Sequence, residues 1–480
     1  MKTLPAGTDL LAAHLGSRDN SLDLLRLISA SLVILGHSYP IVGYGVDPML
    51  KWNGVQFSGG FALHVFFFLS GLLVTHSFLK RPEIGHWLAS RALRIFPGLF
   101  ACLVLTTVVL GPLSTVLTPK QYFTGHETWD YLFGNLLLLR TRYLLPGVFA
   151  HNVEQAVNGP LWSLYIEVRL YLLTGVLLWV FRRLRREWLT LAILGIALVG
   201  LASPKWIFVF GENENHSVCS ALFLLGALCA LWSDRVVISG LWLVVLFLAA
   251  NKYIYTVAFA PLFLFFTCYF VLCFGYSRWL SRVRLPGDYS YGLYIYGWPV
   301  QQLIAEHFPH WSPLQNAGGA MAGAATLAVL SWHFVEKRSL EQKQRFSKAL
   351  AQHWKAVFMI LGVGATILIG LSYPMSRPVE GLGSIVAFGP DKVFAGERFN
   401  VQDGLSAMWV RLSSPVSPQS CVVFQGQKLH SVVSGSLVTA LVPDDLLKKP
   451  GEVEIYVLDE SYLPPKRTAV SKLTIVRRVP

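Results

Sequence analysis

The stretch "SLDLLRLISASLVILGHS", Ser21–Ser38, decides the fold class because it is an apolar run long enough for a membrane helix. It nevertheless carries Arg26 near its start and His37 near its end. Apolar runs of similar length recur as far as Tyr373, and the chain is 54% hydrophobic and only 14% charged. Ordinary soluble domains do not have this composition. The sequence therefore predicts an all-α polytopic membrane helical bundle.

Loop charge predicts the topology of this bundle. The basic loops, such as "KRPEIGHWLASRALR" and "RRLRRE", all fall on one side if the N-terminus is cytoplasmic, as the positive-inside rule requires. An apolar piece at 131–149 contains Arg140 and Arg142 and would reverse every later loop if it crossed, so we expect it to be re-entrant or interfacial. We expect ten core transmembrane helices and an eleventh connecting helix, at 22–43, 57–79, 93–113, 160–181, 188–203, 216–233, 236–250, 255–275, 289–306, 317–335 and 355–373.

In the C-terminal region the hydrophobic pattern changes from long apolar runs to short runs. Short β-rich runs such as "SAMWVRLSS" and "GEVEIYVLD" alternate with Gly, Pro, Ser and Asp, which predicts a small β-sandwich. An odd number of spans makes this sandwich extracytoplasmic. It resembles the immunoglobulin-like IPT/TIG modules in "AGERFNV" and "TALVPDDLL", so it is either a scaffold or a binding surface for an extracytoplasmic partner. The predicted regions are a cytoplasmic N-terminal tail (1–21), a transmembrane domain (22–348), an additional transmembrane helix with a linker (349–377) and the β-sandwich (378–480).

The net charge of +13 does not indicate a nucleic-acid partner. Residues 380–480 hold 11 Lys+Arg and 10 Asp+Glu, a net charge of +1, so the remaining +12 belongs to the membrane part, where short basic loops set topology. No basic stripe with interleaved aromatic residues accompanies the charge. The sequence also has no HExxH, paired CxxC, Walker A or GxGxxG motif, so we expect no metal site and no bound cofactor.

Arg26 and His37 share one face of the first span. They are eleven residues apart, a turn of about 1100° and a rise of ~16 Å, so one lies near each side of the membrane. Ionisable groups within a membrane are candidates for function. The structural alternative is that Arg26 extends to the interface and pairs with Asp23, while His37 is a hydrogen-bonded residue of the bundle.

Glu167, in "GPLWSLYIEVRLYLL", lies about 10 Å from the outer end of its span, a depth close to that of His37. A carboxylate at this depth can orient an imidazole and stabilise its protonated form, as a general base requires. The alternative is a structural ion pair of Glu167 with Arg169 or Arg140.

Two further motifs follow the second span. Ser70 in "FLSG" lacks the GxSxG elbow of a nucleophilic serine, so we expect a polar packing contact beside Gly71. In the inner loop that comes next, Arg91 and Arg94 lie one turn apart and could hold phosphates through forked contacts. The alternative is an ordinary basic inner loop.

Taken in order, these residues resemble the acyltransferase-3 family of membrane acyltransferases over roughly residues 20–340. The similar motifs are Arg26 and His37 as Arg-x10-His, "HVFFFLSGLLV" with Ser70, the Arg91/Arg94 pair as Arg-x-x-Arg, "PLWSLYIEV" with Trp162, Ser163 and Glu167, and "GDYSYGLYIYGWPVQQ". Many members carry a histidine two residues before the last proline of that segment, where this chain has Gly297. We therefore expect no catalytic histidine on this helix.

The resemblance implies an O-acyltransferase of the bacterial inner membrane, surrounded by membrane lipids. It would take an acyl group, most often acetyl, from cytoplasmic acetyl-CoA as co-substrate and transfer it to a hydroxyl of a sugar or glycolipid, commonly in O-antigen or exopolysaccharide. Arg26, Arg91 and Arg94 would bind the donor, with Asp23, Ser70, Trp162 and Ser163 in support. His37, oriented by Glu167, would act as base or carry the acyl group. The competing functions are an exporter of a polysaccharide or lipid precursor and an inert scaffold.

Overall fold

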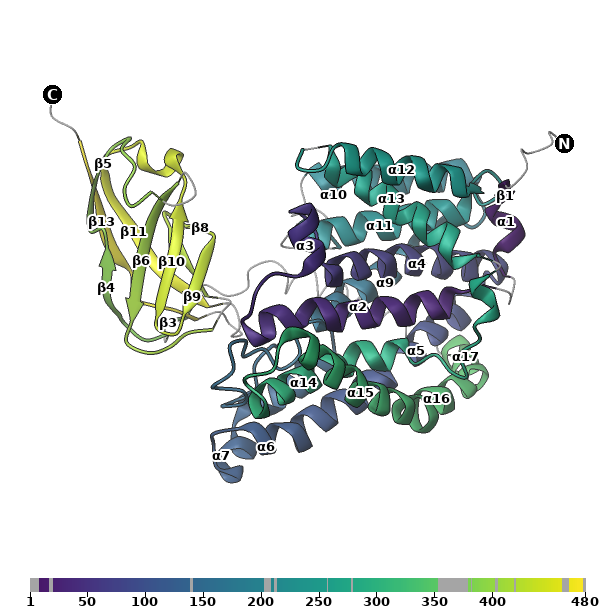
Figure 1. Ribbon diagram of the computed structural model, residues 1–480, viewed down its shortest axis with the longest axis horizontal. Coiled ribbons are helices and arrows are strands. Elements are labelled where there is room, and N and C mark those ends of the chain that lie inside the picture. Colours follow the sequence, from purple (N-terminus) through teal and green to yellow (C-terminus); the bar gives the residue numbers. More distant parts are fainter. Residues whose placement is uncertain are drawn as a thin grey trace. The chain divides into compact units, whose positions relative to one another are not determined.

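The computed structural model divides the chain into two compact units, Met1–Gly362 and Val363–Pro480, which are drawn in Figure 1. The first unit is helical and the second is built from strands. Each unit has its own hydrophobic core. The structure describes residues 8–16, 20–138, 141–202, 209–210, 214–256, 258–277, 279–352, 379–380, 382–401, 405–417, 420–459 and 466–477.

A helix is present at each of the ten predicted core spans, and the eleventh, at 355–373, lies outside the described residues. Within the described part, five helices are long and apolar enough to cross a membrane: Leu22–Val42, Ser58–Lys80, Ile84–Ser114, Leu161–Phe181 and Pro313–Glu341. The helices at the predicted spans are α2 (Leu22–Val42), α4 (Ser58–Lys80), α5 (Ile84–Val104), α9 (Leu161–Phe181), α10 (Arg186–Ala202), α11 (Glu214–Leu231), α12 (Gly240–Lys252), α13 (Phe259–Gly275), α14 (Ser290–His307) and α15 (Pro313–Ser331).

The third helix starts nine residues earlier than predicted, and this corrects the position of two site residues. α5 begins at Ile84, so Arg91 and Arg94 lie on a membrane-domain helix and not in a loop. Their charges suggested an aqueous loop, but carboxylates from other segments lie beside Arg94 and compensate its burial. The helix continues through a π-helical turn, Leu105–Leu110, into α6 (Gly111–Ser114).

The described residues of the apolar piece at 131–149 do not form a spanning helix. The helix α8 (His126–Leu136) covers only its first part, and Val148 forms an isolated antiparallel bridge with Thr115. Arg142 is buried and pairs with Asp130 at 3.0 Å, which compensates its charge. This agrees with the expectation of a re-entrant or interfacial segment. Arg140 lies outside the described residues.

α4 packs between α2 and α11 (Figure 1). Its contact with α11 depends on two glycines that let the backbones approach. A Cβ atom on Gly71 would lie 1.9 Å from the carbonyl oxygen of Phe223, and one on Gly226 would lie 2.2 Å from the carbonyl oxygen of Phe68. Small residues commonly allow such close approach between membrane helices.

Part of the predicted N-terminal tail is structured. The strand β1 (Thr8–Leu10) pairs antiparallel with β2 (Val237–Ser239), just before α12, and the short helix α1 (Leu11–His14) follows. Backbone pairing with a segment more than 200 residues away could not be read from the local sequence. The remaining short helices of this unit are α3 (Pro48–Asn53), α7 (Pro119–Thr124), α16 (Lys337–Glu341) and α17 (Lys343–Gln352).

The C-terminal unit contains two sheets that contribute to one hydrophobic core. In the first sheet the strand order is β4-β6-β10-β9, and in the second it is β3-β12-β11-β13-β5. In the second sheet β7 also pairs with β11, and β8 pairs with β7. Alternating burial along β6, with Met408 inside and Trp409 outside, gives the period of two that the sequence predicted. The immunoglobulin-like assignment stays a prediction. The strands are β3 (Val379–Glu380), β4 (Ile385–Gly389), β5 (Lys392–Phe394), β6 (Ser406–Leu412), β7 (Ser420–Phe424), β8 (Gln427–Lys428), β9 (Ser431–Ser434), β10 (Leu437–Val442), β11 (Gly451–Asp459), β12 (Lys466–Arg467) and β13 (Ser471–Val476).

Candidate active site

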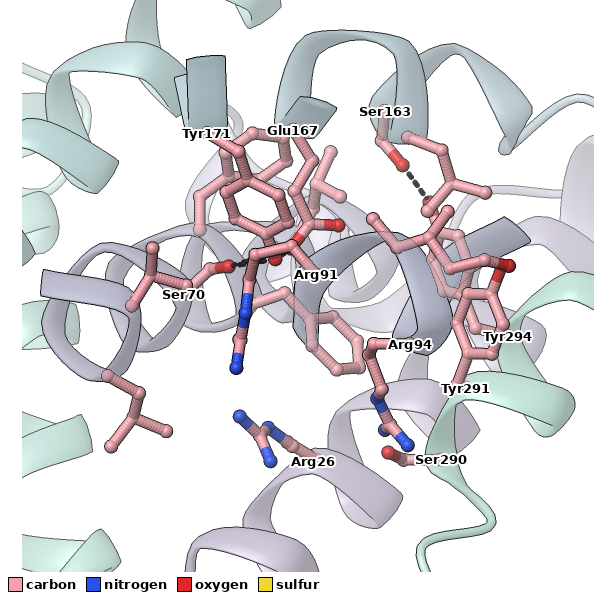
Figure 2. A pocket seen from close by; sticks show the side chains of 17 residues that line it. Arg26, Ser70, Arg91, Arg94, Ser163, Glu167, Tyr171, Ser290, Tyr291 and Tyr294 are labelled. Atoms are coloured by element: carbon pink, nitrogen blue, oxygen red, sulfur yellow. Dashed lines mark hydrogen bonds between the residues drawn. The ribbon is translucent and has the colours of Figure 1, made fainter. Parts of the chain in front are cut away.

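Two cavities inside the helical unit contain most of the predicted site residues. The first, which we call the arginine cavity, has a volume of about 110 Å³ and is shown in Figure 2. Its polar lining consists of Arg26, Ser70, Arg91, Arg94, Ser163, Glu167, Tyr171, Ser290, Tyr291 and Tyr294. The second, which we call the histidine cavity, also has a volume of about 110 Å³. Its polar lining consists of His37, Gln56, His64, Trp162, Asn215 and Tyr294.

Leu63 and Tyr294 line both cavities and therefore form the wall between them. The hydroxyl groups of Tyr294 and Ser163 lie 2.5 Å apart, and the Tyr294 hydroxyl also donates to the carbonyl oxygen of Pro160 at 3.1 Å. Ser163 thus holds the tyrosine side chain of this wall in place. The sequence placed Ser163 in a supporting role without indicating its partner.

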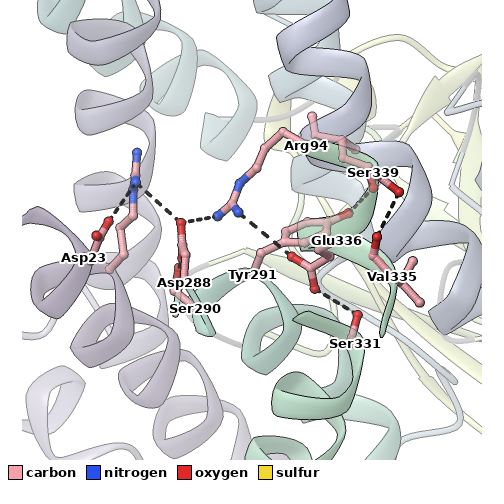
Figure 3. Close-up of polar contacts among 11 residues, drawn as sticks. Asp23, Arg94, Asp288, Ser290, Tyr291, Ser331, Val335, Glu336 and Ser339 are labelled. Carbon is pink, nitrogen blue, oxygen red and sulfur yellow. Dashed lines mark hydrogen bonds and ion pairs between the residues drawn. The ribbon is translucent and has the colours of Figure 1, made fainter. Parts of the chain in front are cut away.

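The arginine cavity brings the three predicted donor-binding arginines together from α2 and α5. Figure 2 shows their guanidinium groups converging on the same space. Arg94 lies between two carboxylates, with distances of 2.5 Å to Asp288 and 3.9 Å to Glu336 (Figure 3). Arg26 lies 3.9 Å from Asp288 and 3.5 Å from Asp23, the partner that the structural alternative predicted.

Arg91 differs from its two neighbours. It lines the cavity, yet within the described ranges it forms no ion pair, and its buried Nε has no hydrogen-bond partner. A buried donor without a partner is unfavourable, and Nε of Arg91 can bond to an anion or another acceptor that enters the cavity. Asp288 and Glu336, which distinguish Arg94 from Arg91, were not predicted. The signal for Asp288 was its place in "GDYSYGLY", immediately before a family motif.

Glu167 does not orient His37, so this part of the predicted site is wrong. Its Oε1 accepts a hydrogen bond from Ser70 at 2.7 Å and another from Tyr171, and these two hydroxyls lie 2.9 Å apart. Glu167 therefore belongs to the arginine cavity. Helical rise gives only depth along a helix, and the direction of the side chain depends on how α9 is rotated against α4. The alternative partner Arg169 lies over the ring of Tyr165, 3.8 Å from its centroid.

His37 is oriented by the backbone. Its Nδ1 lies 2.8 Å from the carbonyl oxygen of Val33 on the same helix. Since a carbonyl only accepts, Nδ1 carries the proton, and Nε2 is left as the acceptor nitrogen in the neutral ring. The ring also makes edge contacts with Phe57 and Trp298, at centroid distances of 5.3 and 5.0 Å. Nε2 is therefore available as a base or a nucleophile, and the Val33 carbonyl has the orienting role that was predicted for Glu167.

A loop between α2 and α4 covers the histidine cavity, and one buried aspartate organises it. Asp47 caps α3 by accepting from the backbone N–H groups of Met49 and Leu50, and it also accepts from the backbone and the hydroxyl of Ser58 at the start of α4. Gln56 and Phe57, which line the cavity, lie between these anchors. In the sequence, Asp47 directly before Pro48 indicates the start of a helix with an N-terminal cap.

The histidine cavity also contains residues that the sequence did not single out. His64 on α4 and Asn215 on α11 join Gln56 in its polar lining. The predicted Trp162 lies here too, with its ring 4.9 Å from the ring of His216. Within the described ranges, no cluster of three His, Cys, Asp or Glu side chains could hold a metal ion.

Comparison with known proteins identifies the family. The acyltransferase-3 profile, an acyltransferase domain, matches residues 19–335, a range that contains every residue lining the two cavities. A protein named O-acetyl transferase from Shigella phage Sf6 is 27% identical over 330 residues, which cover 67% of this chain and 96% of that protein. A protein named Nodulation protein 10 from Rhizobium leguminosarum bv. viciae is 27% identical over 366 residues, which cover 68% of this chain and 95% of that protein. No solved structure shows a significant match. The chain therefore belongs to the acyltransferase-3 family and is a multi-pass membrane O-acyltransferase.

Proposed function

We propose that this enzyme transfers an acyl group, most simply acetyl, from acyl-CoA to a hydroxyl of a cell-surface polysaccharide or glycolipid. The name of the Shigella phage relative supports acetyl as the group. The observation that carries the proposal is the pair of cavities that share Leu63 and Tyr294, one lined by Arg91 and the other by His37. A donor and an acceptor can then enter from opposite ends and meet at the wall formed by Leu63 and Tyr294.

The arginine cavity suits the donor. Coenzyme A is a polyanion, and guanidinium groups bind phosphates through forked, charge-assisted hydrogen bonds. Arg91 is available for this contact, while Arg94 is held by Asp288 and Glu336 and keeps the site in shape. α2 connects the two cavities, since Arg26 lines the arginine cavity and His37 lines the histidine cavity on the same helix.

The histidine cavity suits the acceptor. The hydroxyl proton passes to Nε2 of His37, the hydroxyl oxygen bonds to the acyl carbon, the carbon–sulfur bond breaks, and the proton passes on to the departing thiolate. In the alternative route Nε2 first displaces the thiolate and carries the acyl group. The acceptor oxygen then displaces Nε2, and the hydroxyl proton passes to the thiolate. Both routes require Nε2 without a proton, which is the tautomer that the Val33 carbonyl selects.

We further propose that the enzyme lies in a bacterial inner membrane with its N-terminus and donor entrance in the cytoplasm. The basic loops support this orientation. The C-terminal unit would then be extracytoplasmic. A C-terminal alkaline phosphatase fusion is expected to be active, because this reporter works only outside the cytoplasm, and an inactive fusion with normal protein level would contradict the orientation.

Replacing His37 tests the function directly. We expect His37→Ala to abolish alkali-labile acetate on the surface glycan of producing cells, while the protein level stays normal, because no other group in the cavity has an equivalent nitrogen oriented by Val33. His310→Ala is the matched control, since His310 is exposed and lies outside both cavities. Normal acetate in the His37 variant would contradict the mechanism. Loss of the whole glycan from the surface would instead favour an exporter.

A further inference from the structure

We propose that His64 is a positioning residue that hydrogen-bonds a second hydroxyl of the acceptor and so presents the neighbouring hydroxyl to His37. The partner it fits is a saccharide with two adjacent hydroxyl groups. This inference rests on the proposed function and specifies the acceptor side of the same site. It makes His64 a determinant of which hydroxyl is acylated.

The first observation is the position of His64 on α4. Gly60, Leu63, His64 and Phe67 follow the helical spacing of i, i+3, i+4 and i+7, which places them on one face. This face lines the histidine cavity at its beginning and the arginine cavity further along, and Leu63 belongs to both. His64 therefore lies on the acceptor side of the wall, in the cavity that contains His37.

The second observation is that His64 is buried and unsatisfied. Its side chain is 7% exposed, and its Nδ1 has no hydrogen-bond partner among the residues that the structure describes. Leaving such a buried polar atom unpaired is unfavourable, so a partner from a bound ligand would stabilise it. His37, in contrast, has a backbone partner for its Nδ1. A ligand hydroxyl, which both donates and accepts, can bond to either ring nitrogen of a neutral imidazole.

The rest of the cavity has the chemistry of a sugar site. His37, on α2, and His64, on α4, come from helices that pack side by side, and Gln56 and Asn215 add amide groups from a loop and from α11. Trp162 adds an aromatic surface of the kind on which the C–H face of a sugar ring packs. A few convergent polar groups among aromatic side chains are typical of small-ligand sites.

The test uses the purified full-length enzyme, acetyl-CoA and, as the acceptor probe, the surface polysaccharide of the producing bacterium after removal of its acetyl esters with mild base. CoA release is measured with and without the probe. For His64→Leu we expect the KM for the probe to rise roughly tenfold, the loss expected for about one hydrogen bond. CoA release without the probe and the KM for acetyl-CoA should keep their wild-type values. His64→Gln, which retains a hydrogen-bonding group, should recover part of the loss.

His76→Leu is the matched control because it changes a histidine of the same helix that lines neither cavity. An unchanged KM for the probe in His64→Leu would overturn the proposal. So would an equal loss of probe-independent CoA release, because a purely structural role would lower both.

A labelling experiment on the wild-type enzyme keeps the proposal testable if the variants do not fold. Diethyl pyrocarbonate is small and can reach neutral histidines that line a cavity, as His64 does, and the probe should protect His64 from it. Absence of protection at His64 contradicts the proposal. A third outcome is that the probe protects His64 in the wild-type enzyme but receives no acetyl group. The proposed reaction would then be wrong, while the role of His64 in binding the probe would stand.

Discussion

At the scale of single residues, the three arginines of the arginine cavity differ in how their charges are compensated. Arg94 lies 2.5 Å from Asp288 and near Glu336, whereas Arg91 forms no ion pair in the described part of the chain. The motif Arg-x-x-Arg presents both residues as equivalent. Two carboxylates hold Arg94 in place, whereas Arg91 is the arginine to which our proposal gives the donor.

This difference predicts that substituting Arg91 changes the KM for acetyl-CoA, whereas substituting Arg94 changes the stability of the protein. Arg91→Ala should raise the KM for acetyl-CoA roughly 10- to 100-fold, the loss of a charge-assisted contact, with little change in thermal stability. Arg94→Ala should lower the stability by about 3–5 kcal/mol, because it leaves the buried Glu336 without its arginine and removes the nearer of the two arginines beside Asp288. Thermal unfolding in detergent and steady-state kinetics separate the two. Equal effects of the two substitutions on KM and on stability would contradict this assignment. The control is Arg81→Ala, because Arg81 is exposed and pairs with Glu83.

At the scale of elements, α4 organises the site. One of its faces lines both cavities, and Gly71 on α4 lies against the backbone of α11. The pattern "FLSG" therefore serves two purposes in adjacent residues. Ser70 donates to Glu167 inside the cavity, and Gly71 allows the helix contact that holds α4 in place.

A methyl group added at Gly71 should disrupt this contact. The Cβ of Gly71→Ala would lie 1.9 Å from the carbonyl oxygen of Phe223, and a backbone atom cannot move aside as a flexible side chain can. We expect a loss of about 3 kcal/mol or more in the free energy of unfolding. The control is Gly318→Ala on α15, where nothing lies within 4 Å of the added atom. Equal thermal stability of the two variants would show that α4 and α11 do not pack as described.

At the scale of the whole molecule, the residues of the candidate active site belong to the helical unit, and the C-terminal unit contributes none of them. Every residue that lines the two cavities lies between Arg26 and Tyr294, and the C-terminal unit has its own core. A role for this unit in binding an extracytoplasmic partner stays a prediction.

Deleting residues 379–480 should therefore leave CoA release without an acceptor at the wild-type rate. Transfer to the glycan in cells is the second measurement. Its loss with intact CoA release would assign acceptor capture to the C-terminal unit. Loss of both activities in a protein of normal level would contradict the independence of the two units.

The sequence by itself determined the helices, the strand-rich C-terminal region and the family motifs, because these depend on local hydrophobic periodicity and on residue order. Only the tertiary structure decided the partners of the polar side chains. The depth of Glu167 could be predicted from helical rise, but its side chain pairs with Ser70 and Tyr171 and not with His37. Likewise, nothing near Arg91 or His64 in the sequence distinguishes them from Arg94 or His37. The reason is that rise along one helix gives height, whereas the rotation and packing of several helices decide which side chains face each other.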